Sequence, residues 1–192
     1  MKKLEDMSLE ELWELFPIVL EEHNPNYAIS YSEEKEYLIQ ILNTFSVRRI
    51  NHIGSTSVDG MIAKPIIDIL MELPSNYEMS AVAEFLKKHS WLVMAQNDAE
   101  KTIDLNKGYT PRGYADRVFH LHIKPHDDWG ELYFRDYLRQ HSDVARQYES
   151  LKFSLKKQFE PNRDAYTNAK TDFVLQYTEM ARKEFTGRYL PF

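Results

Sequence analysis

The chain has 192 residues and a formal net charge of −6, and its length fits one domain or a core with a modest appended subdomain. It contains no cysteine, which excludes disulfides and thiolate chemistry and fits a reducing compartment. The charge balance argues against a general nucleic-acid binder, and no run of about 18 apolar residues predicts a membrane span. We therefore expect a cytoplasmic protein.

Predicted helices and strands follow one another in the first two thirds of the chain. Ser8 followed by Glu11 has the pattern of a capping box and predicts a helix through about Leu15. Helical spacing of apolar residues predicts two further helices, over 32–45 and 80–89. Apolar runs bounded by turn residues predict strands over 47–53, 65–73, 91–96, 102–107 and 118–124. A turn over 108–113 is expected between the last two strands.

After Pro125 the predicted strands stop and only helical patterns follow, over 132–140, 144–159 and 163–185. Pro161 marks the break before the last helix. This order predicts an α+β protein in which a mixed β-sheet core with flanking helices spans residues 1–125. Residues 126–192 are expected to form a C-terminal helical subdomain, packed on the core or standing across a cleft.

A small-residue turn followed by a buried acid is the strongest candidate site. Gly54, Ser55 and Thr56 follow one predicted strand, and such a turn lets a ligand approach the backbone and offers hydroxyls to phosphate. Asp68 lies within the next, largely apolar strand, where a carboxylate is costly unless it is paired, hydrogen-bonded or bound to metal. Turns of this composition often only end a strand, but the nearby acid favours a functional interpretation.

Strand geometry limits the acids that could join Asp68. Leu70 and Glu72 share its face, but Glu72 is about 13 Å away along the strand and cannot share an ion directly. We expect Glu72 to be a solvated residue at the rim. Chemistry that uses two metal ions would need another carboxylate, for which Asp104 and Asp116 are the candidates.

Two histidines and a lysine could also contribute to chemistry. Alternation along the predicted strand places His120 and His122 on one face, where they could bind a metal, act as acid or base, or contact phosphate. A polar sheet face under a loop is the structural alternative. Lys64, just before the acidic strand, could reach a phosphate or could equally be a surface lysine.

The predicted C-terminal helices offer further cations. Arg135 and Arg139 are four residues apart on one helix face and could clamp a phosphate, although a solvated pair beside Asp136 is the ordinary interpretation. Lys170 shares a face with Tyr166, an arrangement most typical of core packing by a lysine whose amine reaches solvent.

Several of these segments match a known family. The motifs HIGSTSVDGMIAKPIIDIL, HLHIKP, FRDYLRQH, YESLKFSL and AYTNAKTDFV resemble those of the GrpB family of nucleotidyltransferase-fold proteins, from about Glu36 to Ala181. The resemblance implies a nucleotidyltransferase-like sheet followed by helices. By the family motifs, a cleft would be lined by Gly54, Ser55, Lys64, Asp68, His120, His122, Arg135, Arg139 and Lys170.

In nucleotidyltransferases a Gly-Ser turn holds a triphosphate and an acidic strand beside it holds Mg²⁺. The resemblance therefore implies that Gly54, Ser55 and Thr56 hold phosphates and that Asp68 coordinates Mg²⁺, with Mn²⁺ as a substitute. The chain departs from that pattern two residues later, because Leu70 stands where a second acid is usual.

Three functions remain open from the sequence. The first is metal-dependent transfer of a nucleotidyl group to a small-molecule acceptor. The second is a catalytically degenerate sensor that binds a nucleotide or another phosphorylated metabolite, and the third is a protein-interaction module that uses the C-terminal helices. The first two share a small phosphorylated partner at the Gly54–Ser55 turn, and none involves a membrane.

Overall fold

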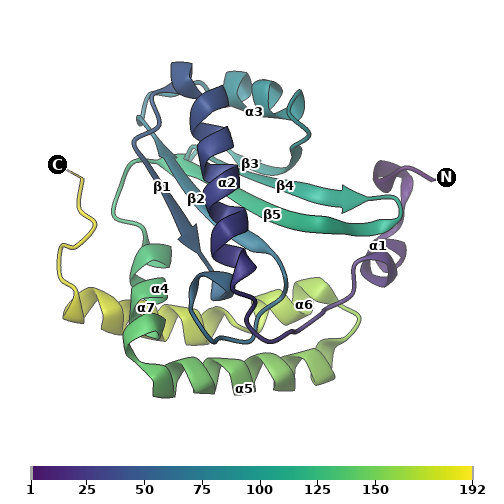
Figure 1. The fold of residues 1–192 in the computed structure, drawn as a ribbon, viewed down its shortest axis with the longest axis vertical. Coiled ribbons are helices and arrows are strands. Elements are labelled where there is room, and N and C mark those ends of the chain that lie inside the picture. Colours follow the sequence, from purple (N-terminus) through teal and green to yellow (C-terminus); the bar gives the residue numbers. More distant parts are fainter. Residues whose placement is uncertain (1, 192) are drawn as a thin grey trace.

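The computed structural model describes residues 2–191 and contains one five-stranded mixed sheet (Figure 1). Its strands are β1 (Arg49–Ile53), β2 (Ile67–Leu73), β3 (Leu92–Asn97), β4 (Thr102–Thr110) and β5 (Gly113–Pro125). They lie in the order β1-β2-β5-β4-β3, and the β2–β5 pair is parallel whereas the other three pairs are antiparallel. The α+β class and the mixed sheet are thus confirmed.

Helices flank this sheet and follow it in the chain. They are α1 (Leu9–Leu15), α2 (Asn26–Ile41), α3 (Met79–Lys87), α4 (Gly130–Gln140), α5 (Ser142–Phe159), α6 (Arg163–Asn168) and α7 (Thr171–Glu184). Short 3-10 turns form η1 (Leu4–Asp6), η2 (Asn43–Phe45) and η3 (Ser55–Ser57). Within residues 126–191 the structure contains helices and no strand, while a division into two domains at residue 125 stays a prediction. Within residues 2–191, no helix is long and apolar enough to cross a membrane.

Alternation along β2 separates the two faces of the sheet. Ile67, Ile69 and Met71 are buried against α2 and α3 in the main hydrophobic core. Asp68 and Leu70 point to the opposite face, where Leu70 packs against residues of β1 and α4. The C-terminal helices gather at one end of the sheet (Figure 1), and Asp68 lines a cavity together with residues of α5 and α6.

Three element boundaries differ from the sequence prediction. Helix α2 begins at Asn26 rather than near Ser32, because the side chain of Asn24 accepts a hydrogen bond from the amide of Asn26 at 2.9 Å. The expected turn over 108–113 is instead part of a longer hairpin, in which Thr110 pairs with Gly113. The predicted helix over 163–185 is broken into α6 and α7, although its apolar spacing continues across the break.

Gly108 explains why the hairpin is longer than expected. It lies in β4 with a φ of +91°, at a shift in register between Lys107 and Tyr109. A Cβ atom at this position would overlap the carbonyl oxygen of Arg117. The glycine therefore permits an irregularity within the strand and does not end it.

Candidate functional site

The turn after β1 is shaped by glycine and by internal hydrogen bonds. Gly54 has a φ of +70°, and its carbonyl accepts a hydrogen bond from the hydroxyl of Ser57 at 2.6 Å. The hydroxyl of Thr56 donates to the carbonyl of Ile66 at 3.0 Å and also contacts the ring of His52. Thr56 is therefore buried and already bonded within the protein, whereas Ser55 faces a lysine.

One cavity of about 280 Å³ joins this turn to the sheet and the C-terminal helices. Eight predicted site residues line it together, namely Gly54, Ser55, Thr56, Lys64, Asp68, His120, His122 and Lys170. Tyr148, Lys152 and Tyr166 complete much of the remaining wall. We call this space the Asp68 cavity.

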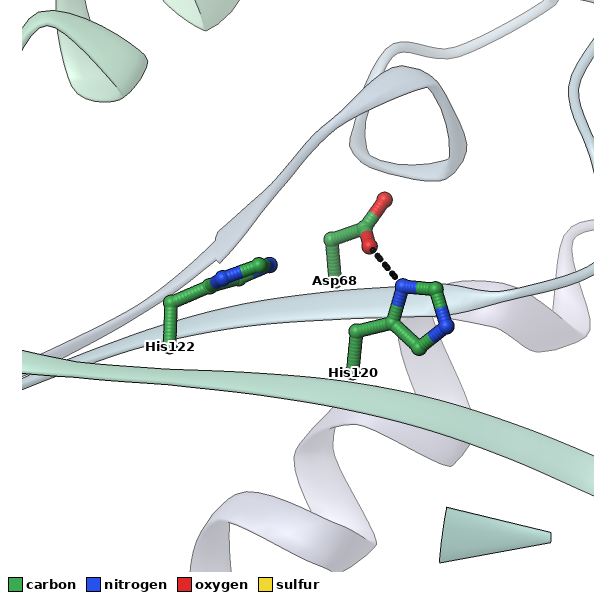
Figure 2. Close-up of side chains that lie close together, drawn as sticks. All are labelled: Asp68, His120 and His122. Carbon is green, nitrogen blue, oxygen red and sulfur yellow. Dashed lines mark ion pairs between the residues drawn. The ribbon is translucent and has the colours of Figure 1, made fainter. Parts of the chain in front are cut away.

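Asp68 and the two histidines meet because β2 and β5 are adjacent parallel strands. Asp68 pairs in register with His120, and Leu70 pairs with His122. Figure 2 shows the three side chains on one face of the sheet, with Nδ1 of His120 3.1 Å from Oδ1 of Asp68. Burial alone would raise the pKa of Asp68, but the hydrogen bond from His120 and nearby positive charges hold it below its ordinary value.

Each histidine also has a partner on its other side. Nδ1 of His122 lies 2.7 Å from Oδ1 of Asp104, and Nε2 of His120 lies 2.7 Å from the hydroxyl of Tyr109. Burial disfavours a charged His122, yet the hydrogen bond to Asp104 and the two carboxylates together raise its pKa. Such pairs orient an imidazole for acid–base chemistry or for metal binding.

Three lysines, Lys64, Lys152 and Lys170, bring positive charge to the wall of the Asp68 cavity. Burial lowers the pKa of Lys152 and of Lys170 to about 8. Burial, followed by repulsion from Lys170 and Arg163, lowers the pKa of Lys64 to about 7. Nζ of Lys152 donates to the hydroxyl of Ser55 at 3.2 Å and to the carbonyl of Ile62. The amine of Lys152 is thereby held at the turn, and an anion in the cavity would stabilise the charged form of all three lysines.

Tyr166 lies between two of these lysines. The amines of Lys64 and Lys170 are 5.4 Å and 4.4 Å from the centre of its ring. Tyr166 is fully buried, and among residues 2–191 its hydroxyl has no hydrogen-bond partner. A buried hydroxyl without a partner is costly, so Tyr166 carries an unsatisfied polar group in the wall of the Asp68 cavity.

The two predicted arginines lie outside the residues that line the cavity. Arg135 is buried and bonds to Asp136 at 2.9 Å, to the carbonyl of His52 and to the hydroxyl of Tyr189. Arg139 donates twice to the carbonyl of Ser57, at 3.0 and 2.7 Å. Arg135 thus bonds to β1 and Arg139 to the turn that follows it, and a phosphate-binding role for them stays a prediction.

The prediction that Glu72 is a solvated rim residue is wrong. Its side chain is 0% exposed and pairs with the guanidinium of Arg49, with one N–O distance of 2.8 Å. It also accepts a hydrogen bond from the amide of Asp127. The sequence places Glu72 near a strand end, but the loop after β5 covers that end.

Neither candidate for a second carboxylate completes a pair with Asp68. Asp104 holds His122, and Asp116 lies exposed on β5 away from the Asp68 cavity. Mg²⁺ prefers an octahedron of oxygen ligands, whereas the cluster around Asp68 offers one carboxylate and two imidazoles. The protein residues therefore fit Mg²⁺ poorly.

Lys152 and Tyr109 are site residues that the sequence analysis missed. Lys152 is 3% exposed and belongs to a buried stripe on α5 with Val144, Tyr148 and Leu155. A lysine on an apolar stripe is a signal that could have identified it. Tyr109 carried no comparable signal, because its position depends on the irregularity at Gly108.

Comparison with protein families and curated proteins gives consistent matches. A family model described as GrpB protein matches residues 17–180. The chain is 32% identical to the glutamate-rich protein GrpB of Alkalihalophilus pseudofirmus, over 82% of this chain and 91% of that protein. It is 31% identical to UPF0157 protein YqkA of Bacillus subtilis, over 86% of this chain and 48% of that protein. The chain thus spans about half the length of YqkA.

Solved structures include a similar fold. The crystal structure of the conserved protein GrpB from Enterococcus faecalis aligns with a TM-score of 0.74 at 28% identity. The alignment covers 87% of this chain and 99% of that one. Likeness to a Cid1 poly(U) polymerase bound to MgATP is weaker, with a TM-score of 0.49, 11% identity and coverage of 78% of this chain and 46% of that one.

Proposed function

The chain belongs to the GrpB family, and we propose that it binds the phosphate groups of a nucleotide or of another phosphorylated metabolite in the Asp68 cavity. The charge of the cavity wall is the observation that carries this proposal. Lys64, Lys152 and Lys170 line a space to which the wall contributes one carboxylate, that of Asp68. When the three amines are protonated, a multiply charged anion would balance the excess positive charge of the cavity wall.

The position of the turn supports phosphate as that anion. Ser55 already accepts a hydrogen bond from Lys152, so an oxyanion beside its hydroxyl would be within reach of the same amine. Lysine donates to phosphate as a compact point charge, and hydrogen bonds between charged groups are stronger than neutral ones. Outside the acidic segment of residues 1–35, acidic and basic residues are equal in number. This zero net charge fits a small ligand better than a nucleic-acid chain.

Transfer of a nucleotidyl group is a second candidate, favoured by one contact. A Cβ at Gly54 would overlap the carboxylate of Asp68, so a phosphate at the turn would lie close to this acid. An acceptor hydroxyl would give its proton to His120 or His122 and attack the α-phosphorus, so that a new P–O bond forms as the α–β phosphoanhydride bond breaks and pyrophosphate leaves. Catalysis would rest on positioning and electrostatics. The sensor differs from the transferase only in lacking this step.

Isothermal titration with inorganic tripolyphosphate and the four ribonucleoside triphosphates, in buffer with chelator, tests the proposal. We expect saturable binding at one site and a loss of at least about tenfold in affinity in Lys152→Met, since a charge-assisted hydrogen bond contributes about 1.5–3 kcal/mol. Lys157→Met changes an exposed lysine of the same helix and is the matched control.

Two outcomes would contradict phosphate binding in this cavity. One is equal affinity in Lys152→Met and the wild type. The other is a thermal stability that no nucleotide or tripolyphosphate changes, which would instead favour the protein-interaction module. A shift in stability that Lys152→Met abolishes and Lys157→Met preserves supports the proposal.

A further inference from the structure

Asp68, His120 and His122 form a compact cluster of possible metal ligands. One ligand atom from each residue lies within 4.8 Å of the others. Bonds from a metal to histidine nitrogen or carboxylate oxygen are about 2.0–2.2 Å long, so small side-chain movements would bring all three atoms onto one ion. Figure 2 shows the three side chains rising from β2 and β5 toward a common point.

The outer hydrogen bonds leave one nitrogen of each histidine for this point. Asp104 holds Nδ1 of His122 and therefore leaves Nε2 as the possible ligand atom. Tyr109 holds Nε2 of His120, whose Nδ1 faces Asp68. Metal-binding histidines generally have a carboxylate or another polar group on the second nitrogen, which fixes the tautomer and the ring orientation.

We propose that Asp68, His120 and His122 bind a single divalent metal ion that favours imidazole, such as Zn²⁺ or Fe²⁺, in preference to Mg²⁺. Imidazole suits these ions, and two histidines with one carboxylate leave coordination positions open. The hydrogen bond between His120 and Asp68 is replaced when the ion takes Nδ1. The hydroxyl of Tyr109 can then accept a hydrogen bond from Nε2–H, since a phenol both donates and accepts.

The open positions face the remainder of the Asp68 cavity, which Lys64, Lys152 and Lys170 also line. A phosphate oxygen of the ligand would therefore reach the ion while other oxygens contact the amines. This part of the inference rests on the proposed function, because it requires a phosphorylated ligand in the same cavity. Binding of the ion itself needs only the three protein ligands.

Metal binding can be measured without any phosphorylated ligand. Untagged protein is stripped with chelator, dialysed and titrated with Co²⁺, whose visible absorption reports its coordination, and then with Zn²⁺ and Mg²⁺ by calorimetry. We expect one equivalent of Co²⁺ or Zn²⁺ to bind and Mg²⁺ to bind at least about a hundredfold more weakly, because Mg²⁺ favours oxygen ligands.

Substitutions assign the ligands. His120→Gln and His122→Gln should each weaken Co²⁺ binding at least about tenfold, and Asp104→Asn should weaken it by about 10–100-fold through His122. His141→Gln is the matched control and should leave Co²⁺ binding unchanged, because His141 pairs with the carboxylate of Glu184 at 2.9 Å and is not part of the cluster. Far-UV circular dichroism checks folding. If a histidine variant unfolds, the Co²⁺ affinity of the folded Asp104→Asn variant tests the proposal.

Absence of Co²⁺ and Zn²⁺ binding, or Mg²⁺ binding of equal affinity, would overturn the inference. So would metal affinity that the folded histidine or Asp104 variants retain. The result is separate from that for phosphate, which is measured with chelator present and depends on Lys152. Phosphate binding without metal binding would refute this inference alone, and metal binding without phosphate binding would refute the proposed function alone.

Discussion

Gly54 and Asp68 lie so close together that no side chain fits between them. A Cβ atom built on Gly54 would overlap Oδ2 of Asp68, and the φ of +70° at Gly54 is itself unfavourable for residues with a side chain. The turn that follows β1 and the face of β2 that carries Asp68 are thereby held in contact. This contact couples the shape of the turn to the position of the carboxylate.

Gly54→Ala should therefore be more damaging than backbone strain alone explains. Strain at a positive φ costs on the order of 1–3 kcal/mol, and displacement of Asp68 should add to this cost. Gly60→Ala is the control, because Gly60 has a φ of +75° but nothing within 4 Å of the added Cβ. Urea denaturation gives both free energies of unfolding, and equal losses in the two variants would contradict the steric argument.

Phosphate affinity should fall as the pH rises from 7 to 9. The pKa of Lys64 is about 7 and those of Lys152 and Lys170 are about 8, so the amines lose their charge across this range. Tripolyphosphate becomes more negative over the same range, so a fall in its affinity reports the protein. Calorimetry at several pH values measures it, and constant or rising affinity would contradict the assignment of these lysines.

The same pKa values predict the stability of the protein without ligand. Unfolded lysines have an ordinary pKa of about 10.4, so between about pH 8 and 10 the unfolded state binds more protons than the folded state. The contribution of these lysines to the free energy of unfolding therefore rises with pH in this window. Lys152→Met should reduce that slope in urea denaturation, and an unchanged slope would argue against a depressed pKa at this residue.

The Arg49–Glu72 pair should be a strong determinant of stability. Arg49→Met leaves the buried carboxylate of Glu72 without its guanidinium, with the imidazole of His126 at 3.5 Å as the remaining basic group, and breaking a buried pair in this way typically costs about 3–5 kcal/mol. Lys87→Met removes one partner of an exposed pair with Glu84 and should change stability little. Chemical denaturation of both variants checks this contrast, and a small effect of Arg49→Met would contradict a dominant role of this pair in stability.

Local patterns in the sequence were sufficient for most of the fold. The capping box at Ser8 is present, with the side chain of Glu11 bonded to the amide of Ser8, and all five strands exist. Local patterns failed where a contact between distant segments decides the outcome. Gly108 lies in β4 with a positive φ, where the backbone of Arg117 in β5 leaves no room for a side chain. The burial of Glu72 depends on Arg49 and on the loop after β5.

The candidate site shows the same division. Alternation correctly placed His120 and His122 on one face, and the parallel register of β2 and β5 then brings them to Asp68. The sequence did not show which cations of the C-terminal helices belong to the candidate site, because it does not reveal which of them are already bonded to other protein groups. Arg135 bonds to protein groups, whereas Lys152 extends from α5 to the turn.

Asp68→Asn separates a transferase from a sensor. In buffer with chelator, we expect the folded variant to bind tripolyphosphate as tightly as the wild type or a few-fold more tightly, because a negative charge beside the phosphates is removed. Transfer of label from α-labelled nucleotides to an acceptor, if the wild type performs it with a divalent metal, should be lost in this variant.

The control for this variant is Asp116→Asn, which changes an exposed carboxylate of β5 away from the Asp68 cavity. It should leave both binding and label transfer unchanged. A wild type that binds nucleotide but transfers no label with Mg²⁺, Mn²⁺ or Zn²⁺ would identify a sensor. Loss of tripolyphosphate binding in folded Asp68→Asn would contradict the charge argument, since it would mean that the carboxylate is needed to hold the lysines in place.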